Sequence, residues 1–235
     1  MLAEGWPQDL RTCLQALVEH APPEVAILVL DLGNVDGAGD VAHEVATAAP
    51  GRVQEWHLER ACGWAEARTA LLRADTATVH IWLDPSSVLT GDAISPVLAA
   101  FDDPTVVGAG WRGVSADPDW LGFTDAAPGE VDALLGYLFG MRRSAALVLG
   151  GPHPKARFYR NADMEFSFAL REAGRATGSD RLVMTGPLPV TQGRHHGYHD
   201  TAVAYRDKES KRTYDRFLQR FRGREDLRVR RAEQA

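Results

Sequence analysis

The sequence predicts an α/β fold in which helices cover both faces of a mixed, mainly parallel sheet. The chain has 235 residues, of which 45% are hydrophobic and 25% charged, and this composition suits one globular domain with a sizeable core. Short apolar runs alternate with segments of helical periodicity, which is the rhythm of βαβ units. Ligands of such sheets bind at the carboxyl ends of the strands.

The predicted elements follow one another with short connections. We expect helices at 9–20, 39–48, 64–74 and 92–101, and strands at 25–31, 53–58, 78–83 and 105–111. The next segment contains Gly, Pro and Asp and continues to about Gly129. We expect it to be a long irregular loop, which either shapes a binding cleft or faces solvent without a role.

The most informative segment is the acidic start of a helix over 162–174. Asn161 is a good N-cap residue, and Gly174 is typical of the position where a helix stops. Asp163 and Glu165 lie in the first turn and a half, where the helix dipole favours the ionised carboxylate that can accept a proton. Acids are also common at helix starts for stability alone, so this segment leaves a purely structural role open.

The same segment resembles the acceptor-side helix of inverting family 2 glycosyltransferases. The resemblance implies a GT-A-like α/β/α sandwich that transfers a sugar from a nucleotide-diphosphate donor to an acceptor hydroxyl. In that register Asp163 is the catalytic base. Ala162 replaces a glutamate of the usual acidic pair, and the register leaves open whether Glu165 compensates for it. Gly136–Arg143 resembles the strand before this helix, and we place Tyr137 with Glu165 on the acceptor side.

Three earlier segments resemble the donor side of the same family. Asp31 ends the first predicted strand and matches an acid that helps to hold the nucleotide. Arg68 follows a glycine at the start of a helix and matches an arginine that faces the diphosphate, and Asp84 and Ser86 occupy the place of a DXD motif. Without the family, Asp31 belongs to an ordinary turn and Arg68 to an exposed helix face.

The resemblance also implies a divalent cation, Mg²⁺ or Mn²⁺, at Asp84. Ser86 replaces the second carboxylate and is a weaker ligand, so we expect weak metal binding. His195 and His196 lie near the position where relatives carry a histidine that approaches the metal or phosphate. The three histidines within five residues are also compatible with an exposed loop or a zinc site.

Members of this family begin with a central strand ahead of the helix that starts here near Asp9. The preceding residues are few and include Gly5 and Pro7, so they are not expected to supply a full strand. The neighbouring strands would then carry unpaired backbone groups that need a partner. This gap predicts a homodimer and an open donor pocket.

Charge divides the chain unevenly. The net charge is −6, yet Arg206–Ala235 contains eleven Lys or Arg against six Asp or Glu. We therefore divide the chain into a glycosyltransferase-like domain at 1–204 and a basic amphipathic helix and tail at 205–235. Tyr214, Phe217, Leu218 and Phe221 form an apolar stripe, which predicts docking on the same domain. A phosphate-bearing acceptor or an anionic membrane surface is the alternative partner of the basic residues. We expect the acceptor of the transfer to be a sugar, a lipid-linked molecule or another small molecule.

Other partners and compartments are constrained by what the sequence lacks. It contains no nucleic-acid-binding signature, no apolar run of membrane-spanning length and no signal-peptide pattern at its start, so we expect a cytoplasmic protein. Cys13 and Cys62 are expected to be reduced. The alternative to an enzyme is a degenerate, non-catalytic binding or scaffolding protein. A nucleotidyltransferase is disfavoured because no glycine-rich phosphate loop follows the first strand.

Overall fold

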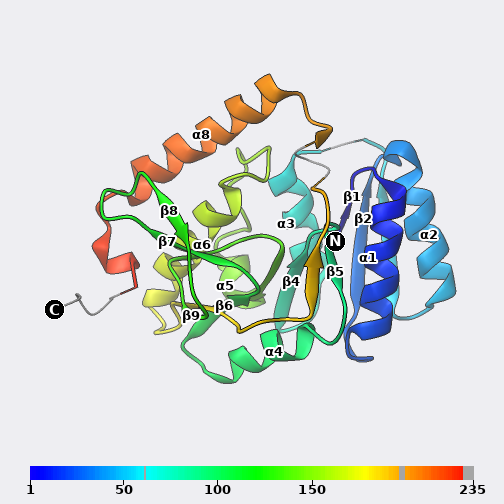
Figure 1. The fold of residues 1–235 in the computed structure, drawn as a ribbon, viewed down its shortest axis with the longest axis horizontal. Helices are drawn as coiled ribbons and strands as arrows, with labels where there is room; N and C mark the ends of the chain where they lie inside the picture. Colours follow the sequence, from blue (N-terminus) through cyan, green and yellow to red (C-terminus); the bar gives the residue numbers. More distant parts are fainter. Residues whose placement is uncertain (61, 196–198, 230–235) are drawn as a thin grey trace.

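The structure, a computed structural model, describes residues 1–60, 62–195 and 199–229 (Figure 1). Its helices are α1 (Pro7–His20), α2 (Ala38–Ala48), α3 (Trp64–Ala74), α4 (Ile94–Ala99), α5 (Arg143–Val148), α6 (Ala162–Arg175) and α8 (Val203–Phe221). Its strands are β1 (Leu2–Ala3), β2 (Ile27–Leu32), β3 (Val53–Leu58), β4 (Val79–Leu83), β5 (Ser87–Leu89), β6 (Val106–Gly110), β7 (Gly113–Ala116), β8 (Phe123–Asp125), β9 (Gly129–Glu130), β10 (Ala133–Leu134), β11 (Leu138–Arg142), β12 (Arg181–Met184) and β13 (Val190–Gln192).

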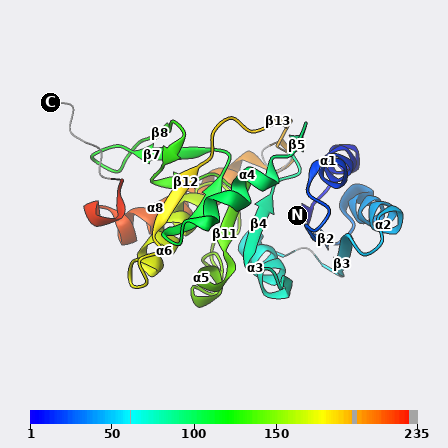
Figure 2. The ribbon, with the colours of Figure 1, turned by 90° about the horizontal axis from the view of Figure 1, so that it is seen from below.

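Two sheets form the middle layer. In the first sheet β1, β2 and β3 are parallel and lie in that order. The second sheet has the order β4-β11-β6-β12-β9, in which β11 is antiparallel to both neighbours and β12 is parallel to β6. Helix α4 lies on one side of β4 and β11, whereas α3 and α5 lie on the other (Figure 2). The predicted α/β/α sandwich on a mixed sheet is confirmed.

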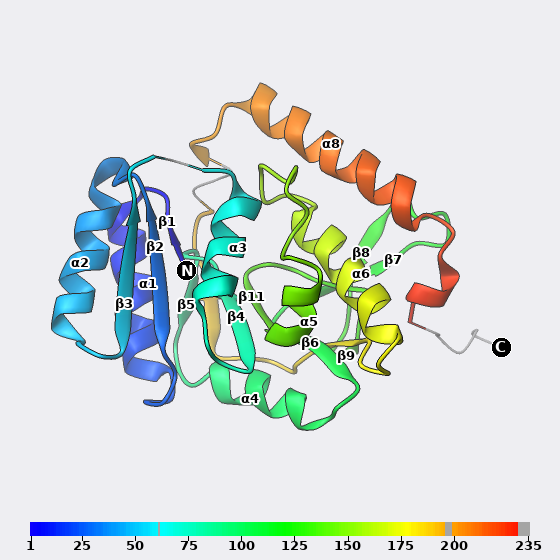
Figure 3. The ribbon, with the colours of Figure 1, turned by 180° about the vertical axis from the view of Figure 1, so that it is seen from behind.

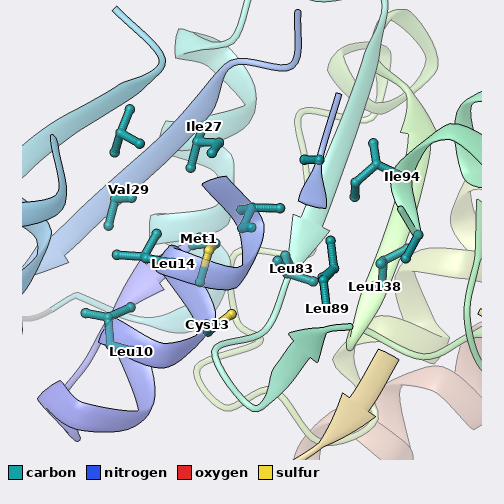
Figure 4. Close-up of a cluster of buried hydrophobic side chains, with 14 of the residues drawn as sticks. Met1, Leu10, Cys13, Leu14, Ile27, Val29, Leu83, Leu89, Ile94 and Leu138 are labelled. Carbon is teal, nitrogen blue, oxygen red and sulfur yellow. The ribbon is translucent and has the colours of Figure 1, made fainter. Parts of the chain in front are cut away.

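The largest apolar core lies between α1 and the strands (Figure 4). Leu10, Leu14 and Leu17 recur at helical spacing on α1 and are buried with Ile27 and Val29 of β2. Each such side chain contributes about 1.5–3 kcal/mol when it leaves water. This packing fixes α1 against β2, which pairs with both β1 and β3.

The first strand is present for only two residues. Leu2 pairs with Leu30 of β2, and the Met1 amine donates to the carbonyl of Leu28 at 2.6 Å. Gly5 (φ 115°) and Trp6 (φ 47°) then turn the chain into α1. A cavity of about 410 Å³ remains beside Met1, between β2 and β4. The N-terminal residues thus fill part of the expected gap, and the homodimer stays a prediction.

The segment after β6 is not the irregular loop that the sequence predicts. Strands β7 and β8 form an antiparallel hairpin, with Val114 opposite Asp125. The loop that joins them is closed by a hydrogen bond from Asp117 N–H to the Gly122 carbonyl, and Trp120 within it is buried. The expectation was wrong because these strands are only four and three residues long and lack a clear alternation of apolar and polar residues.

Helix α8 crosses the molecule above α3 and α6 (Figure 3). Its apolar side chains Phe217 and Phe221 are buried with Trp120 and Phe168. Two basic residues of the C-terminal segment, Arg220 and Arg224, form ion pairs with Glu172 of α6. None of the described helices is long and apolar enough to cross a bilayer.

Candidate active site

The first turn of α6 holds Asp163 against the segment that precedes β11. Its Oδ2 accepts a hydrogen bond from Gly136 N–H at 2.9 Å, and its Oδ1 accepts one from Met164 N–H at 2.9 Å. Burial raises the pKa of Asp163 above its ordinary 3.8, although these hydrogen bonds oppose the shift. The carboxylate is therefore a stronger base than a solvated aspartate, as proton abstraction requires.

Asn161 precedes α6 but does not cap it in the predicted way. Its φ is 67°, its side chain makes no capping hydrogen bond, and its Nδ2 donates to the Ser210 carbonyl of α8. The helix also continues one residue past Gly174. A Cβ at Gly174 would lie 1.8 Å from the Ser179 carbonyl oxygen, so this glycine permits close passage of the following chain. Asn161 and Gly174 therefore serve contacts between distant segments and do not mark the two ends of the helix in the predicted way.

Glu165 lies on a different side of α6 from Asp163. Both of its carboxylate oxygens accept hydrogen bonds from Arg216 of α8, at 2.6 and 2.5 Å. Only 3% of Glu165 is exposed, and it lines a cavity with Phe166 and Arg220 that does not include Asp163. Its observed role is to tie α6 to α8.

Asp84 follows β4 directly and is buried. Its Oδ1 accepts hydrogen bonds from the N–H of Ser86 at 2.9 Å and from the hydroxyl of Ser86 at 2.5 Å, and its Oδ2 lies 3.0 Å from Nε2 of His195. Burial alone would raise the pKa of Asp84, but the hydrogen bonds from His195 and Ser86 hold that pKa well below its usual range. Asp84 is thus kept ionised by the protein's own groups.

His195 reaches Asp84 through a strand pairing that joins distant parts of the chain. Strand β13 is antiparallel to β5, with Gln192 opposite Ser87, and Gly193 N–H donates to the Ser86 carbonyl at 2.7 Å. The chain therefore returns to the end of β4 two residues later. The ring of His195 stacks on Tyr159, with the ring centroids 3.9 Å apart. His196, the neighbouring candidate ligand, lies outside the described residues.

Arg68 is a buried cation on α3. Only 3% of the residue is exposed, and its guanidinium carbon lies 5.8 Å from the Trp64 ring centroid and 5.5 Å from that of Trp82. Within the described residues its Nε and Nη1 have no hydrogen-bond partner. Burial lowers the pKa of Arg68, but a guanidinium remains protonated. Unused donors on a buried charge are costly unless an anion pairs with them.

Asp163, Asp84, His195 and Arg68 line two adjoining cavities. The Glu4 cavity, of about 140 Å³, and the Asp163 cavity, of about 160 Å³, are each named here after a residue that lines only that one. Both are lined by Trp64, Arg68, Asp84, Tyr159 and His195. Tyr137 lines the Asp163 cavity, and its carbonyl accepts the Asp84 N–H at 2.9 Å. The structure therefore gathers most of the predicted residues around one continuous site.

Asp31, like Glu165 and Ser86, lines neither of these cavities in the described structure. Its carboxylate accepts the N–H of Asn34 at 2.9 Å and lies 3.1 Å from Nδ1 of His57. A Cβ at Gly39 would meet the same carboxylate at 2.7 Å. Asp31 thus holds the turn after β2 together, and its donor contact stays a prediction.

Several lining residues carry no role in the sequence-based prediction, among them Glu4, Arg157, Tyr159 and Arg160. Glu4 lines the first cavity with Arg157, and Tyr159 lines both, whereas Arg160 lines the second. The side chains of Arg157 and Arg160 are exposed. The sequence feature that could have identified three of them is the run Arg-Phe-Tyr-Arg, which lies directly ahead of the acidic helix.

The residues at Asp84 do not fit a divalent cation as they are arranged. Both oxygens of Asp84 have partners within the chain, and Ser86 uses its hydroxyl as a donor to Asp84. Throughout the described residues, no three His, Cys, Asp or Glu side chains form a cluster able to hold a metal. Hard divalent cations need several free oxygen ligands.

Comparisons with known proteins agree with this architecture. One similar solved structure is GalNAc-T7 with UDP, GalNAc and Mn²⁺, at a TM-score of 0.71, with 16% identity and coverage of 92% of this chain and 46% of that one. Another is the mannosyltransferase PcManGT from Pyrobaculum calidifontis with GDP-Man and Mn²⁺, at 0.65, with 17% identity and coverage of 85% and 57%. The chain thus spans about half of each.

The likeness to these structures establishes a GT-A-like fold, as the sequence predicted. A comparison with curated proteins finds no match. The model of glycosyl transferase family 2 matches residues 3–166, which include β4, α3 and the start of α6. The chain belongs to glycosyltransferase family 2.

Proposed function

We propose that this chain transfers a sugar from a nucleotide-diphosphate donor to an acceptor hydroxyl with inversion at the anomeric carbon. One observation carries the proposal: a carboxylate whose pKa is raised, Asp163, and a buried guanidinium with unused donors, Arg68, line the same cavity. A base and an anion site on one cavity are what a displacement from a diphosphate requires.

In the proposed reaction the acceptor oxygen attacks the anomeric carbon while Asp163 takes the hydroxyl proton. The bond between that carbon and the diphosphate oxygen breaks, and the leaving group carries away the electron pair. Arg68 stabilises the negative charge that develops there, because a preorganised cation in a partly closed site needs little rearrangement. A single displacement of this kind inverts the anomeric configuration.

The donor class is supported by the two similar structures, which hold UDP and GDP-Man together with Mn²⁺. They also support the use of a divalent cation within the family, and they make uridine and guanosine diphosphate sugars the first donors to examine. Simple sugars and a lipid-linked acceptor near α8 are the acceptors to examine with them.

The test is a donor panel of UDP- and GDP-sugars offered with simple sugar and lipid-linked acceptors. We expect release of a nucleoside diphosphate that depends on the acceptor, and a product whose anomeric proton coupling in the NMR spectrum shows the inverted configuration. Release with retained configuration would contradict the displacement at Asp163. Tight nucleotide binding without turnover across the panel would instead favour a non-catalytic binding protein.

A further inference from the structure

Arg68 is a buried charge that forms no ion pair among the described residues, although Asp84 and Glu4 are near enough to favour its charged form. Its guanidinium carbon lies beside two indole rings, 5.8 Å from the Trp64 centroid and 5.5 Å from that of Trp82, and neither Nε nor Nη1 donates to any described residue. Cation–π contacts offset part of the lost hydration. They do not satisfy directional N–H donors, so the arrangement favours a ligand with acceptor oxygens.

A metal ion held by Asp84 would be the other way to bind a diphosphate, but both carboxylate oxygens of Asp84 already have partners in the chain. Ser86 donates to Oδ1 from both its N–H and its hydroxyl, and His195 lies 3.0 Å from Oδ2. A metal ion at Asp84 would have to displace the His195 contact or share the oxygen that Ser86 occupies. Ser86 offers no second carboxylate in return, and a neutral hydroxyl is a weaker ligand for Mg²⁺ or Mn²⁺.

We infer that this chain binds the diphosphate of its donor directly through Arg68, with no divalent cation between the diphosphate and Asp84. The inference rests on the proposed function and goes beyond it by naming what replaces the metal. Arginine suits this role because its planar fork matches phosphate oxygens with two parallel hydrogen bonds.

The rim of the site supplies further positive charge. Arg157 lines the Glu4 cavity and Arg160 lines the Asp163 cavity, and both side chains are exposed. One guanidinium balances only part of the charge of a nucleoside diphosphate, and these two lie where a bound diphosphate would draw them in. Asp84 and His195 line the same two cavities as Arg68.

The test measures binding of UDP and GDP to the whole chain by calorimetry, once with Mn²⁺ and once with EDTA. We expect the same Kd under both conditions for whichever nucleotide binds. Arg68→Met should weaken that binding roughly 10- to 100-fold, the value of one hydrogen bond to a charged group. Arg73→Met, which removes an exposed arginine of the same helix, is the matched control and should leave Kd unchanged.

A second variant tests the reason for metal independence. Ser86→Asp restores a carboxylate two residues after Asp84, and we expect nucleotide binding to become stronger in Mn²⁺ than in EDTA for this variant alone. Equal binding by Ser86→Asp in both conditions would contradict that reason. Binding by the unaltered chain only in Mn²⁺ would overturn the inference and leave the proposed function standing. Failure to bind either nucleotide under both conditions would overturn the inference and the proposed function together.

Discussion

Asp163 and Asp84 line one cavity, and the protein treats these two carboxylates in opposite ways. Asp84 receives two hydrogen bonds from Ser86 and one contact from His195, and its pKa is held low. Asp163 receives two backbone hydrogen bonds, and burial raises its pKa. Two titratable groups whose environments push their pKa values apart are assigned different chemical tasks by those environments.

This difference indicates which of the two carboxylates is suited to accept a proton. A carboxylate that is stabilised as an anion by three donors is a poor proton acceptor, so Asp84 acts as a fixed negative anchor. A carboxylate destabilised as an anion gains free energy when it takes a proton, so Asp163 suits a base. The residue type alone does not distinguish them, because the assignment depends on what surrounds each side chain.

The strongest way to break this comparison is Asp163→Asn. An amide cannot take the acceptor proton, so we expect turnover to fall by about two to four powers of ten. The fold should be retained, but an amide has one acceptor oxygen where the carboxylate has two, so the N–H of either Gly136 or Met164 loses its partner and we expect a modestly lower unfolding temperature. Nucleotide affinity, measured by calorimetry, should be unchanged. Retention of full turnover would remove Asp163 from the chemistry.

Glu165→Gln is the matched change two residues further along the same helix. It breaks a buried, bidentate pair with Arg216, so we expect the free energy of unfolding to fall by about 2–3 kcal/mol. Turnover under stable conditions should remain close to that of the unaltered chain. Urea denaturation measures the first effect and the sugar-transfer assay the second. A large loss of turnover in a fully folded variant would place Glu165 at the reaction after all.

Sequence reasoning placed Asp163 and Glu165 together on the acceptor side of the site, whereas the structure separates them. The bounds of α3 and β3 agree with those predicted, because strong periodicity marks both segments. The helical register already predicts that Asp163 and Glu165 face different sides, because residues two positions apart on an α-helix are rotated by about 200°. By contrast, local sequence could not predict that β13 pairs with β5 and carries His195 to Asp84.

His195→Ala tests the surroundings of Asp84. The change leaves the buried carboxylate of Asp84 with Ser86 as its only side-chain partner among the contacts described above, so we expect a loss of about 1–2 kcal/mol in the free energy of unfolding. The stacking on Tyr159 is lost as well, and Tyr159→Leu provides a control that removes the stacking and retains the imidazole. Comparison of the two variants by urea denaturation separates these contributions. An effect of His195→Ala no larger than that of Tyr159→Leu would show that Asp84 does not depend on His195.

The smallest expected effect is a displacement of the acid limb of the activity profile. Asp163 must be deprotonated to act, and its folded pKa is raised, so the proton stays on the carboxyl at pH values where an ordinary aspartate is ionised. As pH falls, kcat/KM should therefore decline at a pH above 3.8. Asp84 cannot produce this limb, because its lowered pKa keeps it ionised throughout that range. Unfolding measured over the same pH values excludes loss of structure as the cause. The residual activity of Asp163→Asn should lack the acid limb. An identical limb in that variant would assign the limb to another group, and the raised pKa of Asp163 would then not distinguish it from Asp84 in the reaction.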